Sequence, residues 1–209
     1  MPKERLQTSM VDSPREYSEP VTLKDGGLLV IRALAHSDKR MVMNLFRQLS
    51  PKSVRYRAFA AKSILTEKEL DYLVDVDFVA HVALAAVLRD AEKERIVGVG
   101  RYCRVVPNGA LVTLAEVAFT VLDEDHGRGI GTLLLEHLAS IARANGVDEF
   151  EADVMIDNSK MMEVFANSGF SLRKSLQDGV HHVVFPTAAT TLFLQASHMR
   201  QLGSKGLSA

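Results

Sequence analysis

The sequence lacks the features that would attach it to a membrane or build a cysteine-based site. One cysteine, Cys103, and no tryptophan occur among its 209 residues, which excludes an intrachain disulfide and a cysteine-rich zinc site. The longest apolar run, around "HVALAAVL", is far short of the ~20 residues that a membrane-spanning helix needs. The start, "MPKERLQTSM", has no apolar segment typical of a signal peptide. We therefore expect a cytoplasmic protein with no membrane partner.

An excess of either charge is also absent. Lysine and arginine number 25 against 26 acidic residues, for a net charge of -1, so the composition carries no electrostatic signature of a nucleic-acid partner. Apolar residues make up 47% of the chain, which is enough to bury a sizeable core. The adjacent pair His181-His182 lies in a predicted strand, where neighbours point to opposite faces, so it does not indicate a metal site.

The distribution of proline and of hydrophobic periodicity indicates one domain, from 21 to 197. Residues 1–20 and 198–209 show no period, and we expect a flexible arm and a flexible tail there. The domain begins with a strand at 28–34 and a helix capped by Ser37 or Asp38, which we expect to stop at Ser50-Pro51. A second helix, 66–76, is predicted by the capping box of Thr66 and Glu69.

Three strands and then alternating helices and strands follow. Apolar runs at 80–90, 95–106 and 111–123 are joined by polar or Pro-Gly turns, which is typical of an antiparallel meander. Beyond them the pattern predicts a helix at 129–144, a strand at 149–156, a helix at 159–168 and one or two strands within 181–195. The fold class is therefore α/β, with a mixed, mostly antiparallel central sheet flanked by helices.

The most informative stretch is "DEDHGRGIGTLLLEHL", with glycines at 127, 129 and 131 directly before an apolar helix pattern. It is not a dinucleotide fingerprint, because Thr132 occupies the place of the third glycine, and it is not a Walker loop, because no lysine occurs from 123 to 146. A glycine-rich helix start exposes backbone N–H groups at the positive end of the helix dipole, which suits a pyrophosphate. Arg128 adds a mobile cation there. A plain tight turn is the alternative, although three glycines so close together are costly in a helix start.

This loop resembles the signature loop of the GNAT acetyltransferases, which reads Arg or Gln, two residues, Gly, one residue, and Gly or Ala. His126 stands in the place of the usual Arg or Gln. A second stretch, "DNSKMMEVFANSGF", is similar to the family's second motif, and the resemblance covers about 30 to 195. It implies a GNAT-like sheet with splayed strands that form an acetyl-CoA cleft, no metal, and pyrophosphate binding by His126, Gly127, Arg128, Gly129, Ile130, Gly131 and Thr132.

A narrower resemblance comes from the front half and from "AEVAFTV". Both are similar to the GNAT domain of bacterial protein lysine acetyltransferases that inactivate acetyl-CoA synthetase. Those proteins usually carry a cyclic-nucleotide-binding or acyl-CoA-synthetase-like domain as well, and neither fits in this chain. No ligand control is therefore predicted from the sequence.

The chemistry requires a base, because holding a lysine amine neutral at pH 7 costs about 4.6 kcal/mol. Glu116 lies mid-strand among apolar neighbours, where partial burial would raise its pKa toward neutrality. The resemblance places the family's catalytic glutamate here. The alternatives are a solvent-facing glutamate on an edge strand and a partner of Arg101.

The resemblance also assigns the remaining site residues. The strand after Glu116 should diverge from strand 149–156, which leaves backbone groups of Phe119, Thr120 and Val121 for the pantetheine arm and the thioester carbonyl. Asn158 either orients the thiol end of the cofactor or caps its helix. Many family members protonate the thiolate with a tyrosine where this chain has Phe165, so no side-chain acid is predicted.

The sequence thus predicts an N-acetyltransferase that moves an acetyl group from acetyl-CoA to an amine by direct attack, with Glu116 as general base. A protein lysine, such as one on acetyl-CoA synthetase, is the preferred acceptor. A small-molecule amine and a non-catalytic acyl-CoA-binding regulatory module are the alternatives.

Overall fold

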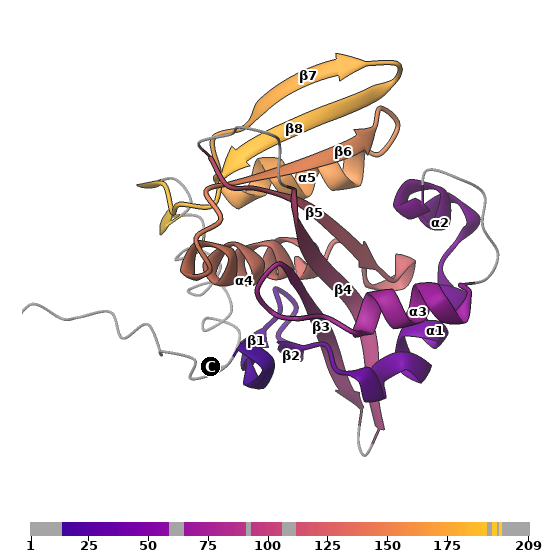
Figure 1. Ribbon diagram of the computed structural model, residues 1–209. Helices are drawn as coiled ribbons and strands as arrows, with labels where there is room; N and C mark the ends of the chain where they lie inside the picture. The colour runs from indigo at the N-terminus through magenta and orange to yellow at the C-terminus, as the bar shows by residue number, and fades with distance from the viewer. Residues whose placement is uncertain are drawn as a thin grey trace, which may run out of the picture.

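The computed structural model describes residues 14–58, 65–90, 93–105 and 112–191, with 194, 195 and 197. Its centre is an eight-stranded sheet in the order β1-β2-β3-β4-β5-β6-β8-β7 (Figure 1). The strands are β1 (Ser18–Thr22), β2 (Leu28–Ala33), β3 (His81–Asp90), β4 (Lys93–Val105), β5 (Leu114–Val121), β6 (Glu149–Met155), β7 (Arg173–Gln177) and β8 (Val180–Pro186). Every neighbouring pair is antiparallel except β5 and β6, which are parallel. The predicted mixed, mostly antiparallel sheet is therefore confirmed.

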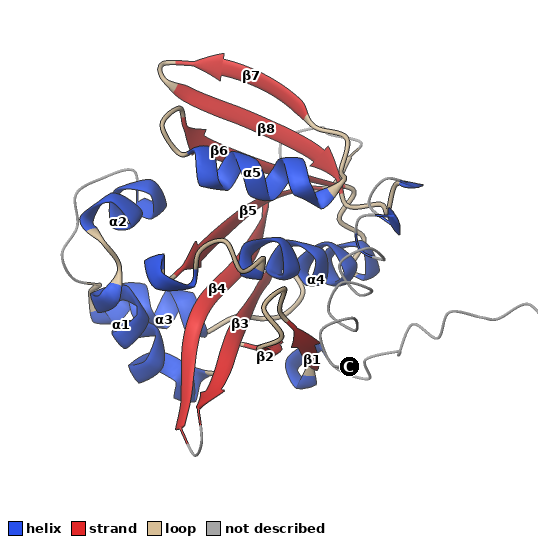
Figure 2. Ribbon diagram, turned by 180° about the vertical axis from the view of Figure 1, so that it is seen from behind, coloured by secondary structure: helices blue, strands red, loops and turns tan. Residues whose placement is uncertain are grey.

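Helices cover both faces of this sheet (Figures 1 and 2). One face carries α4 (Ile130–Ala144) and α5 (Ser159–Ser168), and the other carries α1 (Lys39–Gln48), α2 (Pro51–Ala58) and α3 (Glu67–Val74). Alternation along β5 divides its side chains between the two layers: Ala115, Val117 and Phe119 are buried toward α4, whereas Glu116 faces the other way. Because α4 carries the chain from β5 to β6, it is the crossover that makes this one pair parallel.

The parallel pair is short, and this opens the sheet. β5 and β6 pair only over three residues, from Leu114 opposite Glu149 to Glu116 opposite Glu151. Both strands continue beyond that point, β5 to Val121 and β6 to Met155, without pairing to each other. The predicted divergence of the two strands is thus confirmed, and the cleft described below lies between them.

Two helix signals in the sequence have the expected geometry. The side chain of Thr66 accepts from the backbone N–H of Glu69, and the Glu69 carboxylate accepts from the N–H of Thr66, so the capping box is formed. At the end of α4, Gly146 takes a positive φ of 74° after Asn145, the C-cap.

Two elements were not predicted. The first helix ends before Ser50-Pro51 as expected, at Gln48, but a second short helix, α2, follows directly, and the hydroxyl of Ser50 accepts from the N–H of Ser53. The strand β7 was not predicted, because all five of its residues are exposed and show no alternation. The described part of the final apolar stretch contains one strand, Val180–Pro186, in agreement with the one or two strands expected within 181–195.

The expected arm is in part a regular structure. Residues 18–20 belong to β1, which pairs with β2. The rest of the predicted arm up to residue 13, the tail 198–209 and the Pro-Gly turn near residue 109 lie outside the described residues. Within the described part of the chain, no helix combines the length and apolar character needed to cross a bilayer.

Candidate active site

A cleft of about 560 Å³ lies where β5 and β6 separate. Its wall comes from five places: the turn between β1 and β2, the end of β5, the start of α4, the start of α5 and the helix α2. Among the residues lining it are Lys24, Lys52, Tyr56, Arg57, Phe119, Thr120, Val121, His126, Gly127, Gly129, Ile130, Gly131, Thr132, Asn158 and Lys160. Ten of the twelve predicted site residues are therefore brought together, and the exceptions are Glu116 and Arg128.

The start of α4 has the geometry of an anion site. Gly127 and Gly129 have φ of 80° and 89°, in the left-handed region where glycine is unstrained. The first intrahelical hydrogen bond runs from the N–H of Leu133 to the carbonyl of Gly129, so the N–H groups of residues 130–132 have no partner within the described residues. Three such donors at the positive end of a helix suit a phosphate.

The third glycine has a different role. A Cβ on Gly131 would lie 3.0 Å from Cγ2 of Val164, a residue of α5 that also lines the cleft. Gly131 therefore allows α4 and α5 to approach closely beside this turn. The simple turn that we weighed as the alternative explains Gly127 and Gly129 but not this third position.

His126 supports the turn through its side chain. Its Nε2 donates to the carbonyl of Val121 at 3.0 Å, and its Nδ1 accepts from the ammonium of Lys160 at 2.8 Å, which is the tautomer that these two partners require. The imidazole thereby connects the end of β5 to α5 and holds Lys160 at the cleft.

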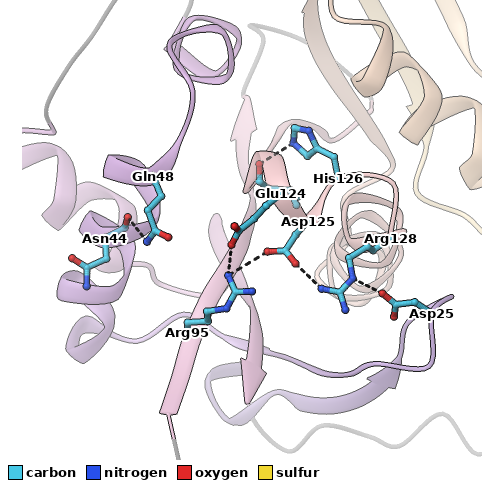
Figure 3. A network of polar contacts seen from close by, with 9 residues as sticks. Asp25, Asn44, Gln48, Arg95, Glu124, Asp125, His126 and Arg128 are labelled. Atoms are coloured by element: carbon cyan, nitrogen blue, oxygen red, sulfur yellow. Dashed lines mark hydrogen bonds and ion pairs between the residues drawn. The ribbon is translucent and has the colours of Figure 1, made fainter. Parts of the chain in front are cut away.

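Arg128 is not the mobile cation that we expected. Its guanidinium donates to Asp25 at 2.6 Å and to the buried Asp125 at 2.5 Å, and Asp125 also pairs with Arg95 (Figure 3). These hydrogen bonds to two carboxylates raise the pKa of Arg128. Arg128 therefore fixes the β1–β2 turn to the loop, while Lys24, Lys52 and Lys160 are the lysines that line the cleft.

The end of β5 presents backbone groups to the cleft at alternate residues. The N–H of Leu122 bonds to β4, at the carbonyl of Val97. Because N–H groups alternate in direction along an antiparallel strand, the N–H of Thr120 also points to β4. The N–H groups of Phe119 and Val121 point the other way, toward the separated β6. Two of the three predicted residues thus have N–H groups available to a ligand.

Glu116 is exposed, so the expected partial burial was wrong. It lies on the strand about 10 Å before Phe119, outside the wall of the cleft. Within the described residues it forms no ion pair with Arg101, and β5 is a central strand rather than an edge. Its neighbour on the parallel strand is Glu151.

Glu151 is the carboxyl whose environment is perturbed. Burial raises its pKa, and the charges of Asp153 and Glu116 raise it further, while His182 lowers it. His182 approaches both acids, with 2.9 Å from Nδ1 to Asp153 and 3.6 Å from Nε2 to Glu151. A glutamate pair with one partly shielded member thus lies at the point where β5 and β6 part.

Asn158 and Phe165 occupy the start and the middle of α5. The Asn158 side chain accepts from the N–H of Met161 at 3.2 Å, so it caps the helix, and it also lines the cleft. Phe165 is buried against Phe119 and Phe185 and has no proton to donate.

The helix α2 contributes cleft residues that the sequence analysis did not assign. Ser50 and Ser53 bond to the carboxylate of Asp123 at 2.8–3.0 Å, which ties the helix to the end of β5. On the other side, Tyr56 donates to the carbonyl of Asp157 at 2.7 Å, and Arg55 pairs with the Asp157 carboxylate. The Ser-Pro pair before the basic run 51–62 was the signal that could have identified this helix.

Comparisons with known proteins agree with this geometry. A model of the acetyltransferase (GNAT) family matches residues 54–170. An acetyltransferase of Mycolicibacterium smegmatis named Pat is 32% identical over 157 residues, which cover 72% of this chain and 43% of that protein. The chain therefore spans less than half the length of this relative.

Solved structures show the same arrangement. The GNAT domain of S. lividans PAT is 35% identical, with a TM-score of 0.73, over 81% of this chain and 96% of that one. The protein yncA from Salmonella typhimurium, solved with its cofactor acetyl-CoA, is 14% identical, with a TM-score of 0.61, over 78% and 96% of the two chains. At that identity the second match shows a common fold.

Proposed function

Because this chain belongs to the GNAT family of acetyltransferases, which use acetyl-CoA, we propose that it acetylates a lysine side chain of a protein, with Glu116 as the general base. The observation that carries the proposal is the position of Glu116. It lies on β5 at the last residue paired with β6, directly before the stretch whose N–H groups face the cleft. The likeness to Pat proteins and to the protein lysine acetyltransferases favours a lysine acceptor. A cytoplasmic location is part of the same proposal.

The cosubstrate is held by groups of this chain that fit it. The free N–H groups of residues 130–132 receive the pyrophosphate, and Lys24, Lys52 and Lys160 supply positive charge around it. The bound thioester supplies an activated acetyl group. The N–H groups of Phe119 and Val121 donate to the pantetheine arm and to the carbonyl that is attacked.

Glu116 accepts the proton of the acceptor amine, directly or through a water molecule. Its exposure allows a lysine side chain to reach it from solvent. Proton transfer by a positioned carboxylate contributes about 10²–10⁴-fold to such a reaction. Since Phe165 occupies the place of the family's tyrosine, the proton that returns to the thiol comes from solvent or from the product ammonium.

The test compares the wild type, Glu116→Gln and the matched control Glu94→Gln, whose glutamate lies on β4 and pairs with Arg89. Release of the free thiol of coenzyme A is measured with acetyl-CoA and either a lysine-containing protein, acetyl-CoA synthetase first, or a panel of small amines. We expect kcat to fall by about 10²–10³-fold in Glu116→Gln. The Kd for acetyl-CoA should not change, and the control should match the wild type.

Each other result points to one of the alternatives. Turnover only with a small amine would replace the protein acceptor with a small-molecule one. Tight binding of acetyl-CoA without turnover of any acceptor would identify a non-catalytic binding module. Full activity of Glu116→Gln would remove the proposed base.

A further inference from the structure

A second cavity, of about 440 Å³, lies on the Glu116 face of the sheet, beneath α1 and α3. Its wall is mostly aliphatic and aromatic, from Val42, Leu45, Phe46, Leu49, Leu65, Leu73, Val99 and Ala118. Arg57 and Thr120 line both this cavity and the acetyl-CoA cleft, so the two adjoin. We call it the acceptor-side cavity.

Two arginines in this apolar wall have no carboxylate partner among the residues that the structure describes. Arg101, on β4, stacks with its guanidinium 5.1 Å from the ring centre of Tyr72, and its Nη1 is buried without a hydrogen-bond partner in the described residues. Arg57, on α2, forms no ion pair with any acid that the structure describes. Burial lowers the pKa of Arg57 to about 10, and the charge of Arg101 contributes to this.

No acid within the described residues forms an ion pair with either arginine, although the charge of Glu116 acts on Arg57 and opposes the lowering of its pKa. Glu69 also lines the cavity, but its carboxylate accepts from the backbone N–H and the hydroxyl of Thr66, at 2.8 and 2.6 Å, as part of the α3 cap. Glu116 lies one diagonal step from Arg101, since Glu116 pairs with Cys103 and Arg101 with Ala118. Such diagonal neighbours are about 7–8 Å apart between backbones.

Two neighbouring guanidinium groups in an apolar wall are unfavourable unless something compensates them. Buried charges are normally paired, and a fixed arginine fork matches the two oxygens of a carboxylate. We infer that Arg57 and Arg101 bind a carboxylate of the acceptor, next to the amine that Glu116 deprotonates. This inference rests on the proposed function and adds a substrate feature to it: the acceptor carries an anionic group close to its reactive amine.

The same chemistry can come from two sources. In a protein acceptor it is an aspartate or glutamate near the target lysine, and in a small acceptor it is the carboxylate of a free amino acid. The apolar wall accommodates the methylene groups of either. We favour the protein source, since the cavity is lined by many aliphatic side chains that a peptide segment can contact.

The experiment uses peptides with a single lysine and either glutamate or glutamine at each of the three positions on both sides. Values of kcat/KM are measured for the wild type, Arg57→Gln, Arg101→Gln and the control Arg89→Gln, whose arginine is exposed at the far end of β3 and pairs with Glu94. Lysine and lysinamide form the small-molecule arm. The variant Arg101→Lys is included in case Arg101→Gln does not fold, which a thermal melt detects.

We expect glutamate to exceed glutamine by about 10- to 100-fold in kcat/KM at one or more positions in the wild type, as is typical of a charged hydrogen bond. In both arginine-to-glutamine variants this ratio should fall toward one, mainly through KM. The control should keep the wild-type ratio. A higher kcat/KM for lysine than for lysinamide, together with equal values for the glutamate and glutamine peptides, would confirm the subsite and assign it to free amino acids.

Two results would overturn the inference in distinguishable ways. Equal rates with glutamate and glutamine at every position, and with lysine and lysinamide, would refute the carboxylate subsite and leave the acetyltransferase proposal intact. Absence of turnover with every peptide and amine would refute the proposed function, and the subsite with it.

Discussion

At the scale of single residues, two glutamates on different strands meet where the sheet opens. Glu116 and Glu151 are opposite each other on β5 and β6, yet Glu116 is exposed and Glu151 is partly shielded. The pair combines an accessible carboxylate with one whose pKa is raised by burial and by neighbouring negative charge. We interpret Glu151 as a charge that attracts a cationic amine toward Glu116.

This interpretation predicts a pH-dependent KM. Because the pKa of Glu151 is raised, its charge is lost at a higher pH than that of an ordinary glutamate as the solution is acidified. The variant E151Q should therefore have a several-fold higher KM for a lysine peptide at neutral pH, and its KM should rise less on acidification. Initial-rate kinetics from pH 5 to 8 measure this. If E151Q had the KM of the wild type at every pH, this role of Glu151 would be contradicted. The control is Glu67→Gln, on the exposed face of α3.

At the scale of the element, the two ends of α4 use one backbone conformation for different purposes. Gly129 begins the helix beside the cleft, with φ of 89°, and Gly146 follows its last turn, with φ of 74°. A Cβ on Gly146 would meet nothing within 4 Å, and one on Gly129 would meet only the side chain of Lys24, at 3.6 Å or more. The conformational strain of an alanine is therefore similar at the two sites.

These two glycines form a matched pair for a test. Gly129→Ala and Gly146→Ala should each lower the free energy of unfolding by about 1 kcal/mol, the usual strain of a left-handed non-glycine residue. Only Gly129→Ala should also weaken acetyl-CoA binding, by about tenfold, because it disturbs the N–H groups that we propose to bind the pyrophosphate. Isothermal titration and urea unfolding separate the two effects. Equal affinities of the two variants would show that the turn does not bind the phosphates.

The helix α2 connects the two separated strands across the cleft. Asp123, which follows β5, accepts a hydrogen bond from Ser53 near the N-terminal end of α2. Asp157, which follows β6, accepts a hydrogen bond from Tyr56 and forms an ion pair with Arg55. Since Lys52, Tyr56 and Arg57 line the cleft, this clasp positions one of its walls.

Removing one bond of the clasp should loosen that wall. In Tyr56→Phe the hydrogen bond to the carbonyl of Asp157 is lost, and we expect the Kd for acetyl-CoA to rise about 2- to 10-fold, as for a single neutral hydrogen bond. Tyr72→Phe, which removes a hydroxyl 3.4 Å from Cys103 and outside this cleft, should leave the Kd unchanged. Titration of each variant with acetyl-CoA decides the matter, and an unchanged Kd in Tyr56→Phe would argue against the clasp.

Elements with strong local signals could be predicted from the sequence, and those without could not. The capping box predicted the start of α3 correctly, and the apolar face that ends at Asn145-Gly146 predicted α4. Ser50-Pro51 was ambiguous, because the same pair can end one helix or begin the next. The strand β7 has no buried face, although the Asp178-Gly179 pair, with both φ positive, is a hairpin signal that marks its turn into β8.

At the scale of the whole molecule, the site depends on tertiary arrangements that alternation alone does not specify. The period of two placed Glu116 on one face of β5 correctly, but what covers that face depends on the distant helices α1, α2 and α3, so its exposure could not be predicted. Arg128 was expected in the cleft because it follows Gly127, yet Asp25, about a hundred residues earlier, holds it elsewhere. The divergence of β5 from β6 was predicted only through the family resemblance.

A buried contact between the first strand region and α4 predicts how the fold responds to acid. His137, on α4, accepts a hydrogen bond from the hydroxyl of Tyr17, just before β1, and the rings meet edge to face at 5.7 Å. Burial lowers the pKa of His137 to about 4, from 6.5 in an unfolded chain. Between these values the unfolded state binds more protons than the folded state, so acidification favours unfolding.

The sign and size of this effect follow from the two pKa values. Above about pH 6.5 the titration of His137 does not reduce the free energy of unfolding. As the pH falls, this titration lowers the free energy of unfolding by about 2 kcal/mol at pH 5 and by about 3 kcal/mol below pH 4. His137→Gln keeps a hydrogen-bond acceptor for Tyr17 but cannot gain a proton, so its free energy of unfolding should fall less than that of the wild type between pH 7 and pH 5. Urea unfolding at both pH values measures the difference, with His36→Gln, an exposed histidine, as the control. Carboxylates such as Asp38 titrate in all three proteins, so their effect cancels in the comparison. An identical loss of stability in His137→Gln and the wild type would show that His137 is protonated in the folded state as readily as in the unfolded chain.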